Sequence, residues 1–385
     1  MPTHLPSLAD PPPRGAAPHT EQSASPRRAL TLFVAVKALC LAVLFLWAQL
    51  ADRDAYTLLS ARWDSLWYVR VVEHGYDFTL TAPDGRVLSD MAFFPLLPWL
   101  EEGLSALTPL GPADAGVLIS AVASIAAAWG IFRVVDAVYG ERAALFTVAI
   151  WGALPVAIVQ SMAYSESLFT ALAAWALYSV QRRNWLLAGV LASLAGLTRP
   201  VGLAVAAALW VAALLAWKTS TDRRRLVAGM VLAPLGAAGY VLWVGQRTGS
   251  LFGYLDVQGA WGNGFDGGVA FARFIGEHLF SPAFAAGLGL LAAVVLVGWL
   301  YVRGVRQGQP PSLLVYCGIV VVLALCSSGF FGSKPRLLMP AFPLLIPLGL
   351  ALARTRAAVA WSVVAGAAAV AAVYGAFWLH GSGPP

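Results

Sequence analysis

Residues 29–50 read ALTLFVAVKALCLAVLFLWAQL, and this stretch decides the fold class. A helix needs about 20 largely apolar residues to cross the hydrocarbon core of a bilayer. Arg27 and Arg28 precede the stretch, as they would in a signal peptide. However, it is longer than the apolar core of about 7 to 15 residues in such a peptide, and no cleavage site of small residues follows it. We therefore expect a first membrane span that is retained.

Further apolar runs follow along the whole chain. They cover roughly 114–134, 143–161, 165–181, 185–198, 200–217, 226–245, 282–302, 312–328, 338–353 and 357–378. Hydrophobic residues make up 59% of the chain and charged residues only 11%, which is more apolar surface than a water-soluble fold can bury. The sequence therefore predicts an all-α, polytopic membrane protein with about eleven transmembrane helices. These helices would form a single membrane-embedded domain over residues 29–385.

Basic residues between the apolar runs indicate the orientation, because cytoplasmic connections carry an excess of Lys and Arg. With the N-terminus in the cytoplasm, the inner connections each hold at least two basic residues; they are 133–142, 182–184, 218–225, 303–311 and 354–356. Residues 1–28, rich in Pro, Ser and Ala, are expected to be a disordered cytoplasmic tail. The outer loops are then roughly 51–113, 246–281 and 328–336, and the long first loop is expected to contain interfacial helices.

The net charge of +6 does not indicate a nucleic-acid partner, because the basic residues form short clusters between apolar runs. The sequence has no Gly-rich phosphate loop, no metal-ligand spacing and no nucleophile elbow. His74 lies beside an acid, but without a recognised ligand spacing. We therefore expect neither a metal nor a cofactor. Nothing in the very short inner loops indicates an ATP or nucleotide-sugar site, and a donor embedded in the lipid would remove the need for one.

The first outer loop opens with RWDSLWY, residues 62–68. On a helix, Trp63 and Trp67 would share one stripe, so that the helix would lie at the interface with Asp64 close to the bilayer surface. The tryptophans would partly desolvate the Asp64 carboxylate, while Arg62 would stabilise its charge. Such opposed influences are what a general base requires. The alternative is that Asp64 caps a helix or forms an ordinary salt bridge.

Residues 92–100, AFFPLLPWL, combine aromatic rings with two prolines. Pro95 and Pro98 prevent a regular helix throughout this segment. Its rings, Phe94 among them, could line a groove for a polyisoprenyl chain. They could equally pack inside a re-entrant turn, so both interpretations stay open.

An acid and several hydroxyls occur together in QSMAYSESL, residues 160–168, at the outer end of two apolar runs. An ionisable group at membrane depth is costly and indicates function. Ser165 could instead be a helix cap, with Glu166 as a first-turn acid that complements the helix dipole. The sequence favours neither interpretation of Glu166.

Arg199, Lys334 and Arg336 are basic residues on the outer side, where topology disfavours them. Arg199 is followed by Pro200 and has no acid nearby in the sequence. A phosphate at headgroup level would explain these cations, because Arg binds phosphate through a planar fork and Lys as a point charge. The alternative is that each side chain simply extends to the lipid headgroups.

Several sequence blocks, in the same order, resemble the PIG-V-like mannosyltransferases of the glycosyltransferase C superfamily. The blocks are Arg62-Trp63-Asp64, Trp67-Tyr68, Glu73-His74-Gly75-Tyr76, Ala92-Phe93-Phe94-Pro95-Leu96-Leu97-Pro98, Tyr164-Ser165-Glu166-Ser167-Leu168-Phe169, Thr198-Arg199-Pro200 and Arg336-Leu337-Leu338-Met339-Pro340. The resemblance is concentrated in the first half of the chain and is weaker in the last third. The Ala-, Arg- and Gly-rich composition favours an actinobacterial member.

The resemblance implies a multi-span enzyme that takes a sugar, most simply mannose, from a polyprenyl- or dolichyl-phosphate donor. It also implies that the acidic residue of the first outer loop, here Asp64, is the catalytic base. The residues expected to contact substrate are Arg62, Trp63, Trp67, Tyr68, Glu73, His74, Phe94, Tyr164 and Glu166. Eukaryotic members act on glycolipid anchor precursors, whereas for this chain an extracytoplasmic glycolipid or envelope glycan is the expected acceptor.

A lipid phosphate is a good leaving group, so this reaction needs cations to stabilise its charge and no general acid. One carboxylate suffices as the base for a single inverting displacement. Arg199, Lys334 and Arg336 are the candidates for binding the phosphate.

The main alternative is a transporter or flippase for lipid-linked sugars or small solutes, because Glu166 and Arg199 could line a pathway. Transporters tend to show two related halves with interrupted helices. The sequence shows no such internal repeat, and its long first outer loop is unusual for a transporter. A scaffold without enzymatic activity is a further alternative.

Overall fold

The computed structural model describes residues 26–383. The expected tail therefore lies outside the described residues up to position 25, and the first helix already begins at Arg27. The first half of the chain forms α1 (Arg27–Leu50), α2 (Ala55–Ser60), α3 (Asp64–His74), β1 (Thr79–Thr81), β2 (Val87–Ser89), η1 (Asp90–Ala92), α4 (Leu96–Leu107), α5 (Pro112–Tyr139), α6 (Glu141–Gly152), η2 (Ala157–Ser161), α7 (Ser165–Gln181), α8 (Trp185–Gly196), η3 (Pro200–Gly202) and α9 (Leu203–Ala216). The second half forms α10 (Arg223–Leu232), α11 (Leu235–Thr248), α12 (Gly253–Ala260), α13 (Val269–Leu279), α14 (Phe284–Arg306), α15 (Pro311–Cys326), η4 (Phe331–Ser333), α16 (Lys334–Leu338), η5 (Phe342–Leu345), α17 (Ile346–Arg354) and α18 (Ala357–His380).

Every apolar run expected from the sequence contains a helix. In the described part of the chain, five helical segments are long and apolar enough to cross a membrane: Arg27–Leu50, Pro112–Tyr139, Arg223–Thr248, Phe284–Arg306 and Ala357–His380. A sixth is added if Phe331–Leu338 and Phe342–Arg354, which meet at 76°, form one broken span. The other apolar helices are shorter. A largely helical chain with several potential spans is confirmed, whereas the number of about eleven spans remains a prediction.

Small residues let the helices of the bundle approach closely. α5 packs along α7, and a Cβ built on Gly130 would lie 2.9 Å from the Cβ of Ala174. α8 packs against α10, where a Cβ on Gly189 would lie 2.6 Å from the Gly229 carbonyl oxygen. Such contacts are typical of membrane helices, which associate through close packing because lipid tails provide no hydrophobic drive. The bundle is thus a tightly packed support for the site.

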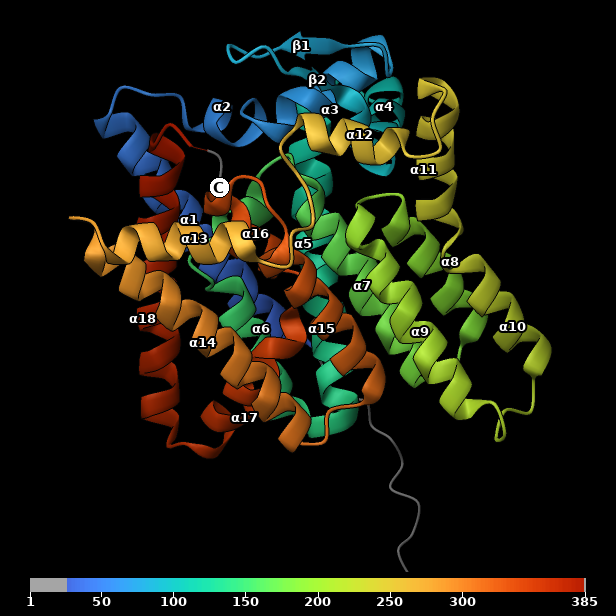
Figure 1. Cartoon of the computed structure of the whole chain (residues 1–385). Coiled ribbons are helices and arrows are strands. Elements are labelled where there is room, and N and C mark those ends of the chain that lie inside the picture. The colour runs from blue at the N-terminus through green and yellow to red at the C-terminus, as the bar shows by residue number, and fades with distance from the viewer. Residues whose placement is uncertain (1–25, 384–385) are drawn as a thin grey trace, which may run out of the picture.

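One end of the bundle carries a cap, defined as residues 51–111 together with α12 (Figure 1). Within it, β1 and β2 pair antiparallel, with Thr79 opposite Ser89. Their connection contains Asp84-Gly85, with Gly85 at a φ of +84°. An Asp-Gly turn between residues that favour strands is a hairpin signal. The all-α expectation was therefore wrong for this short segment.

The connections α9–α10, α14–α15 and α17–α18 lie at the end opposite the cap (Figure 1). These are three of the basic connections identified in the sequence, and they include 218–225 and 354–356. The fold thus separates the basic connections from the cap, as the positive-inside rule requires of a membrane protein. Which end faces the cytoplasm remains a prediction.

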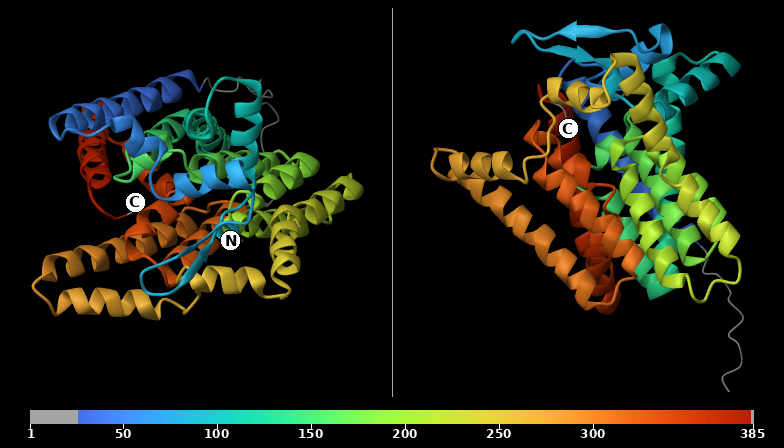
Figure 2. Two further views of the ribbon diagram at one scale, coloured as in Figure 1. Left: turned by 90° about the horizontal axis from the view of Figure 1, so that it is seen from above. Right: turned by 45° about the vertical axis from the view of Figure 1, so that its right-hand side comes forward.

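Within the expected second outer loop, α13 is an amphipathic helix. Phe271 and Ile275 are buried, while Arg273 and Glu277 are exposed. Figure 2 shows that α13 and α14 form a hairpin that projects from the bundle. Such a helix suits a position at a membrane surface.

Candidate functional site

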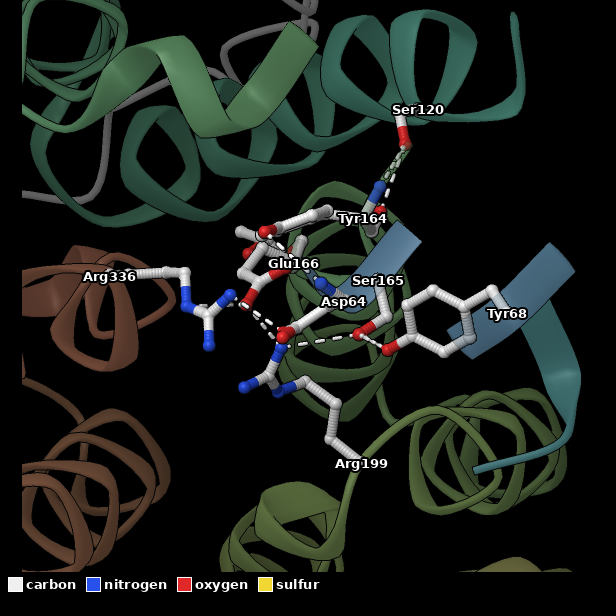
Figure 3. A network of polar contacts seen from close by, with 9 residues as sticks. Asp64, Tyr68, Ser120, Tyr164, Ser165, Glu166, Arg199 and Arg336 are labelled. Carbon is white, nitrogen blue, oxygen red and sulfur yellow. Dashed lines mark hydrogen bonds and ion pairs between the residues drawn. The ribbon is translucent and has the colours of Figure 1, made fainter. Parts of the chain in front are cut away.

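Four charged side chains from distant parts of the sequence meet where the cap, which contains Asp64, contacts the bundle (Figure 3). Nη1 of Arg336 donates to Oδ2 of Asp64 at 2.7 Å, and Nε of Arg336 lies 3.4 Å from Oε1 of Glu166. The same Glu166 oxygen accepts a hydrogen bond from Nη1 of Arg199. Two carboxylates and two guanidiniums therefore form one continuous cluster, which we call the charge quartet.

Each member of the quartet stands at a helix end or beside a break. Asp64 is the first residue of α3, and Glu166 lies in the first turn of α7. Carboxylates are favoured at these positions because the helix dipole is positive at its N-terminus. Arg199 follows the C-terminus of α8, where a cation is favoured, and Arg336 belongs to the short α16. The local folds therefore support the charges that they bring together.

Burial distinguishes the two carboxylates. The side chain of Glu166 is 1% exposed, and those of Arg336 and Arg199 are 9% and 16% exposed. Asp64 is the most accessible member, with 24% of its side chain exposed. Within the described residues, Oε2 of Glu166 has no hydrogen-bond partner. A substrate arriving from outside the bundle would therefore meet Asp64 before Glu166.

Hydroxyl groups surround the quartet (Figure 3). Tyr68 donates to Oγ of Ser165 at 2.9 Å, and the same oxygen accepts from Nη1 of Arg199 at 3.2 Å. The Tyr164 hydroxyl accepts a long 3.4 Å hydrogen bond from the Asp64 backbone N–H. Burial raises the pKa of Tyr68, so its hydroxyl stays protonated as a donor. Ser165, which the sequence suggested only as a helix cap, is therefore a shared partner of two site residues.

The prediction that Arg62 is the charge partner of Asp64 was wrong. Arg62 stacks on the Trp63 ring at 3.9 Å and donates to the carbonyl oxygens of Leu379 and Gly381. It therefore joins the cap to the end of α18, and Arg336 is the partner of Asp64. Sequence proximity favoured Arg62 because a pair separated by 272 positions leaves no local signal.

The expected stripe of Trp63 and Trp67 is also wrong. Trp63 precedes α3 with a φ of +51°, an uncommon conformation for a non-glycine residue, and packs against the main core. Trp67 instead stacks on Phe93 at 5.6 Å and meets the Trp261 ring edge-on at 4.8 Å. The break at Trp63 places the two rings in separate clusters, and it starts the helix at Asp64.

Three other residues expected at the site lie away from the quartet. Glu73 and His74 occupy the opposite end of α3, at least half exposed and 3.9 Å apart. At 1.5 Å rise per residue, they stand about 14 Å along the helix from Asp64. Phe94 is 2% exposed and packs on Tyr240 at 4.4 Å between ring centroids. For this ring the packed alternative holds.

The proline segment contains the start of a helix. α4 starts at Leu96, so Pro98 lies in its first turn. Proline is tolerated there because the first N–H groups of a helix have no intrahelical partner. The segment before it is non-helical, as the sequence indicated.

Lys334 has a contact pattern that the sequence did not reveal. Its Nζ donates to the Ala324 carbonyl oxygen at 2.8 Å and to that of Ser327 at 2.6 Å. It also lies 5.0 Å from the Phe271 ring centroid. Lys334 thus satisfies carbonyls at the end of α15 and joins α13, α15 and α16. Only Arg199 and Arg336 of the three expected cations enter the quartet.

Within residues 26–383, no three His, Cys, Asp or Glu side chains gather to hold a metal ion. Asp64 and Glu166 instead use arginine as their shared counter-ion. The arrangement can do two things chemically. Its accessible carboxylate can accept a proton, and its two guanidiniums can stabilise an anion.

The comparisons with known proteins agree with a membrane transferase fold. Residues 92–243 match the family model of the dolichyl-phosphate-mannose-protein mannosyltransferases. ArnT from Cupriavidus metallidurans, bound to undecaprenyl phosphate, superposes with a TM-score of 0.55 and 18% identity, covering 89% of this chain and 62% of ArnT. The apo oligosaccharyltransferase of Archaeoglobus fulgidus gives a TM-score of 0.53 and 15% identity, covering 93% of this chain and 56% of that enzyme. No curated protein matches the chain in sequence.

The chain spans about three fifths of the length of these structural neighbours. At such low identity, the likeness shows a shared fold. This shared fold and the family match over residues 92–243 agree with the resemblance to the glycosyltransferase C superfamily, whereas the narrower resemblance to PIG-V-like enzymes remains a prediction.

Proposed function

We propose, from the premise that this chain has the glycosyltransferase C fold, that it transfers a hexose from a polyprenyl-phosphate donor to a hydroxyl of a glycolipid or envelope glycan. Mannose is the sugar that the sequence resemblance favours. The carrying observation is the charge quartet, in which an accessible carboxylate lies beside two partly buried guanidiniums. Such a site suits a reaction in which the acceptor hydroxyl loses a proton while the donor sugar loses its phosphate.

In this mechanism Asp64 is the general base. It takes the proton of the acceptor hydroxyl as the hydroxyl oxygen attacks the anomeric carbon of the sugar. The bond from that carbon to the phosphate oxygen breaks in the same step, and the lipid phosphate departs with the bonding electron pair. A single displacement inverts the anomeric configuration, and the charge that develops on the phosphate is stabilised by Arg199 and Arg336.

The proposed site faces the extracytoplasmic side of the cell membrane, with the N-terminus in the cytoplasm. This orientation is supported by the position of the basic connections at the end opposite the cap. It also suits the substrates, because a lipid-linked donor needs no cytoplasmic nucleotide-sugar site. The partly exposed Trp67 is the proposed substrate contact beside Asp64, whereas the buried Tyr68 and Tyr164 are proposed to hold the site residues in place.

The test is an assay of the purified protein with polyprenyl-phosphate mannose and a membrane lipid extract, with the product identified by mass spectrometry. The wild type should consume the donor and add one hexose to an acceptor lipid or glycan. Asp64→Asn should insert normally and lose transfer by at least about 100-fold, the usual contribution of a general base.

Asp77→Asn is the matched control, because Asp77 also pairs with an arginine, Arg247, but is 76% exposed on the cap. This variant should transfer sugar at the wild-type rate. Normal turnover by Asp64→Asn would refute the assignment of the base. Binding of the lipid-linked sugar without consumption by the wild type would favour a scaffold or a flippase.

A further inference from the structure

We infer that the donor phosphate and Asp64 compete for Arg336, so that donor binding releases Asp64 to act as a base. This inference rests on the proposed function and adds a coupling between donor binding and removal of the acceptor proton. Glu166 is the permanent counter-ion of the arginine pair, and Asp64 is the exchangeable one.

The two carboxylates differ in the contacts that hold them. Glu166 is 1% exposed and interacts with both Arg199 and Arg336. Among the contacts of residues 26–383, the Asp64 carboxylate pairs with Arg336 alone and is 24% exposed. Moving Glu166 would leave two poorly hydrated guanidiniums without it, whereas moving Asp64 frees a single Arg336 nitrogen. Asp64 is therefore the carboxylate that an incoming anion can replace.

Charge balance makes the replacement favourable. Without substrate, the quartet has two positive and two negative charges. A donor phosphodiester adds one more negative charge, and a departing monoester phosphate carries about −1.5 to −2 at pH 7. Like charges in a partly desolvated site repel strongly. The repulsion is relieved when Asp64 turns from Arg336 toward the open side, where water or an acceptor hydroxyl can solvate it.

The exchange would make proton removal by Asp64 depend on donor binding. In the resting site Oδ2 of Asp64 is engaged, because it accepts a charge-assisted hydrogen bond from Arg336. Once phosphate occupies Arg336, Oδ2 of Asp64 is free to accept a hydrogen bond from the acceptor hydroxyl. Asp64 is therefore available to the acceptor only when a donor is bound, and donor binding should precede productive binding of the acceptor.

The experiment measures binding of undecaprenyl phosphate to the purified full-length chain in detergent micelles. Asp64→Asn keeps the shape of the side chain and removes the competing charge. It should bind the lipid phosphate at least about tenfold more tightly than the wild type, because close charge pairs couple by that much or more. Asp77→Asn, which removes a carboxylate from the exposed pair with Arg247, should bind like the wild type.

A double-mutant cycle assigns the effect to Arg336. In an Arg336→Gln background, Asp64→Asn should bring no gain in affinity, because there is no shared partner to compete for. In an Arg336→Lys background, which keeps the positive charge, part of the gain should return. The lysine variant also covers the case in which Arg336→Gln fails to fold.

Three results would overturn the inference. One is that Asp64→Asn binds undecaprenyl phosphate no more tightly than the wild type, which leaves the proposed transferase intact. The second is an equal gain with and without Arg336, which would indicate a general charge effect. The third is a wild type and Asp64→Asn that both fail to bind this probe, which would overturn the proposed donor class together with the inference.

Discussion

Replacing Glu166 by alanine tests whether this buried carboxylate holds the arginine pair together. Glu166 is 1% exposed, accepts from Arg199 and lies 3.4 Å from Nε of Arg336. Removing one partner of a buried ion pair costs about 3–5 kcal/mol, because the remaining charge stays buried without compensation. Arg336 keeps its hydrogen bond to Asp64, so we expect a loss near the lower end, about 3 kcal/mol. Asp64→Ala should cost only about 1 kcal/mol, since Asp64 is partly hydrated and Arg336 keeps Glu166.

The assay is thermal unfolding of the detergent-solubilised variants, followed by tryptophan fluorescence at one fixed scan rate. A fixed rate is needed because membrane proteins often unfold irreversibly, and then only ordered comparisons are meaningful. Glu73→Ala, a change of an exposed acid on the same helix as Asp64, should stay within about 0.5 kcal/mol of the wild type. Glu166→Gln should fall between wild type and Glu166→Ala, because the amide oxygen can still accept. A Glu166→Ala protein that melts at or above the temperature of Asp64→Ala would refute the reasoning.

Two further predictions concern the contact between α4 and α5. A Cβ on Gly116 would lie 2.5 Å from Oε1 of Glu101, so Gly116→Ala should lower the free energy of unfolding by about 1–3 kcal/mol. The control is Gly103→Ala, where a Cβ would meet nothing within 4 Å, so this change should be neutral or stabilising by up to about 1 kcal/mol. Thermal unfolding measures both. Burial raises the pKa of Glu101 well above its ordinary value of 4.5, so the folded chain keeps a proton that the unfolded chain loses, and stability should fall as pH rises from 4.5 toward the folded pKa. Glu101→Gln should remove this decline and melt above the wild type at about pH 8; a parallel decline in both proteins would contradict the assignment.

The sequence predicted the helices well, because the length and composition of an apolar run are properties of one contiguous segment. Runs such as 114–134 and 357–378 therefore correspond to long helices, α5 and α18. The hairpin in the cap was missed, although Asp84-Gly85 was a local signal for it. Two strands of three residues each are too short to produce a clear alternation of polar and apolar residues in a chain dominated by apolar helices.

The members of the quartet could be found one by one from the sequence, but their pairing could not. Arg199 and Arg336 stood out as cations on the outer side, and Asp64 and Glu166 as acids beside apolar runs. Their partners lie 33 to 272 positions away, and only the packing of α3, α7 and α16 brings them together. For Lys334 the sequence predicted a role that its contacts do not support. Its charge suggested that it binds phosphate, whereas its hydrogen-bond partners are backbone carbonyls.

The contacts around η2 hold the irregular segment that leads to the quartet. Lys37, in the middle of α1, donates to the Ala157 carbonyl oxygen at 2.6 Å, and Nε1 of Trp151 donates to that of Met339 at 3.1 Å. Gln160 in turn donates to the Trp151 carbonyl oxygen at 3.1 Å. These bonds satisfy irregular backbone inside the bundle, where an unpaired polar group is costly, and they lock the segment that leads to the quartet. An interior held in this way agrees with a site that is reached from one side, as the proposed transferase requires.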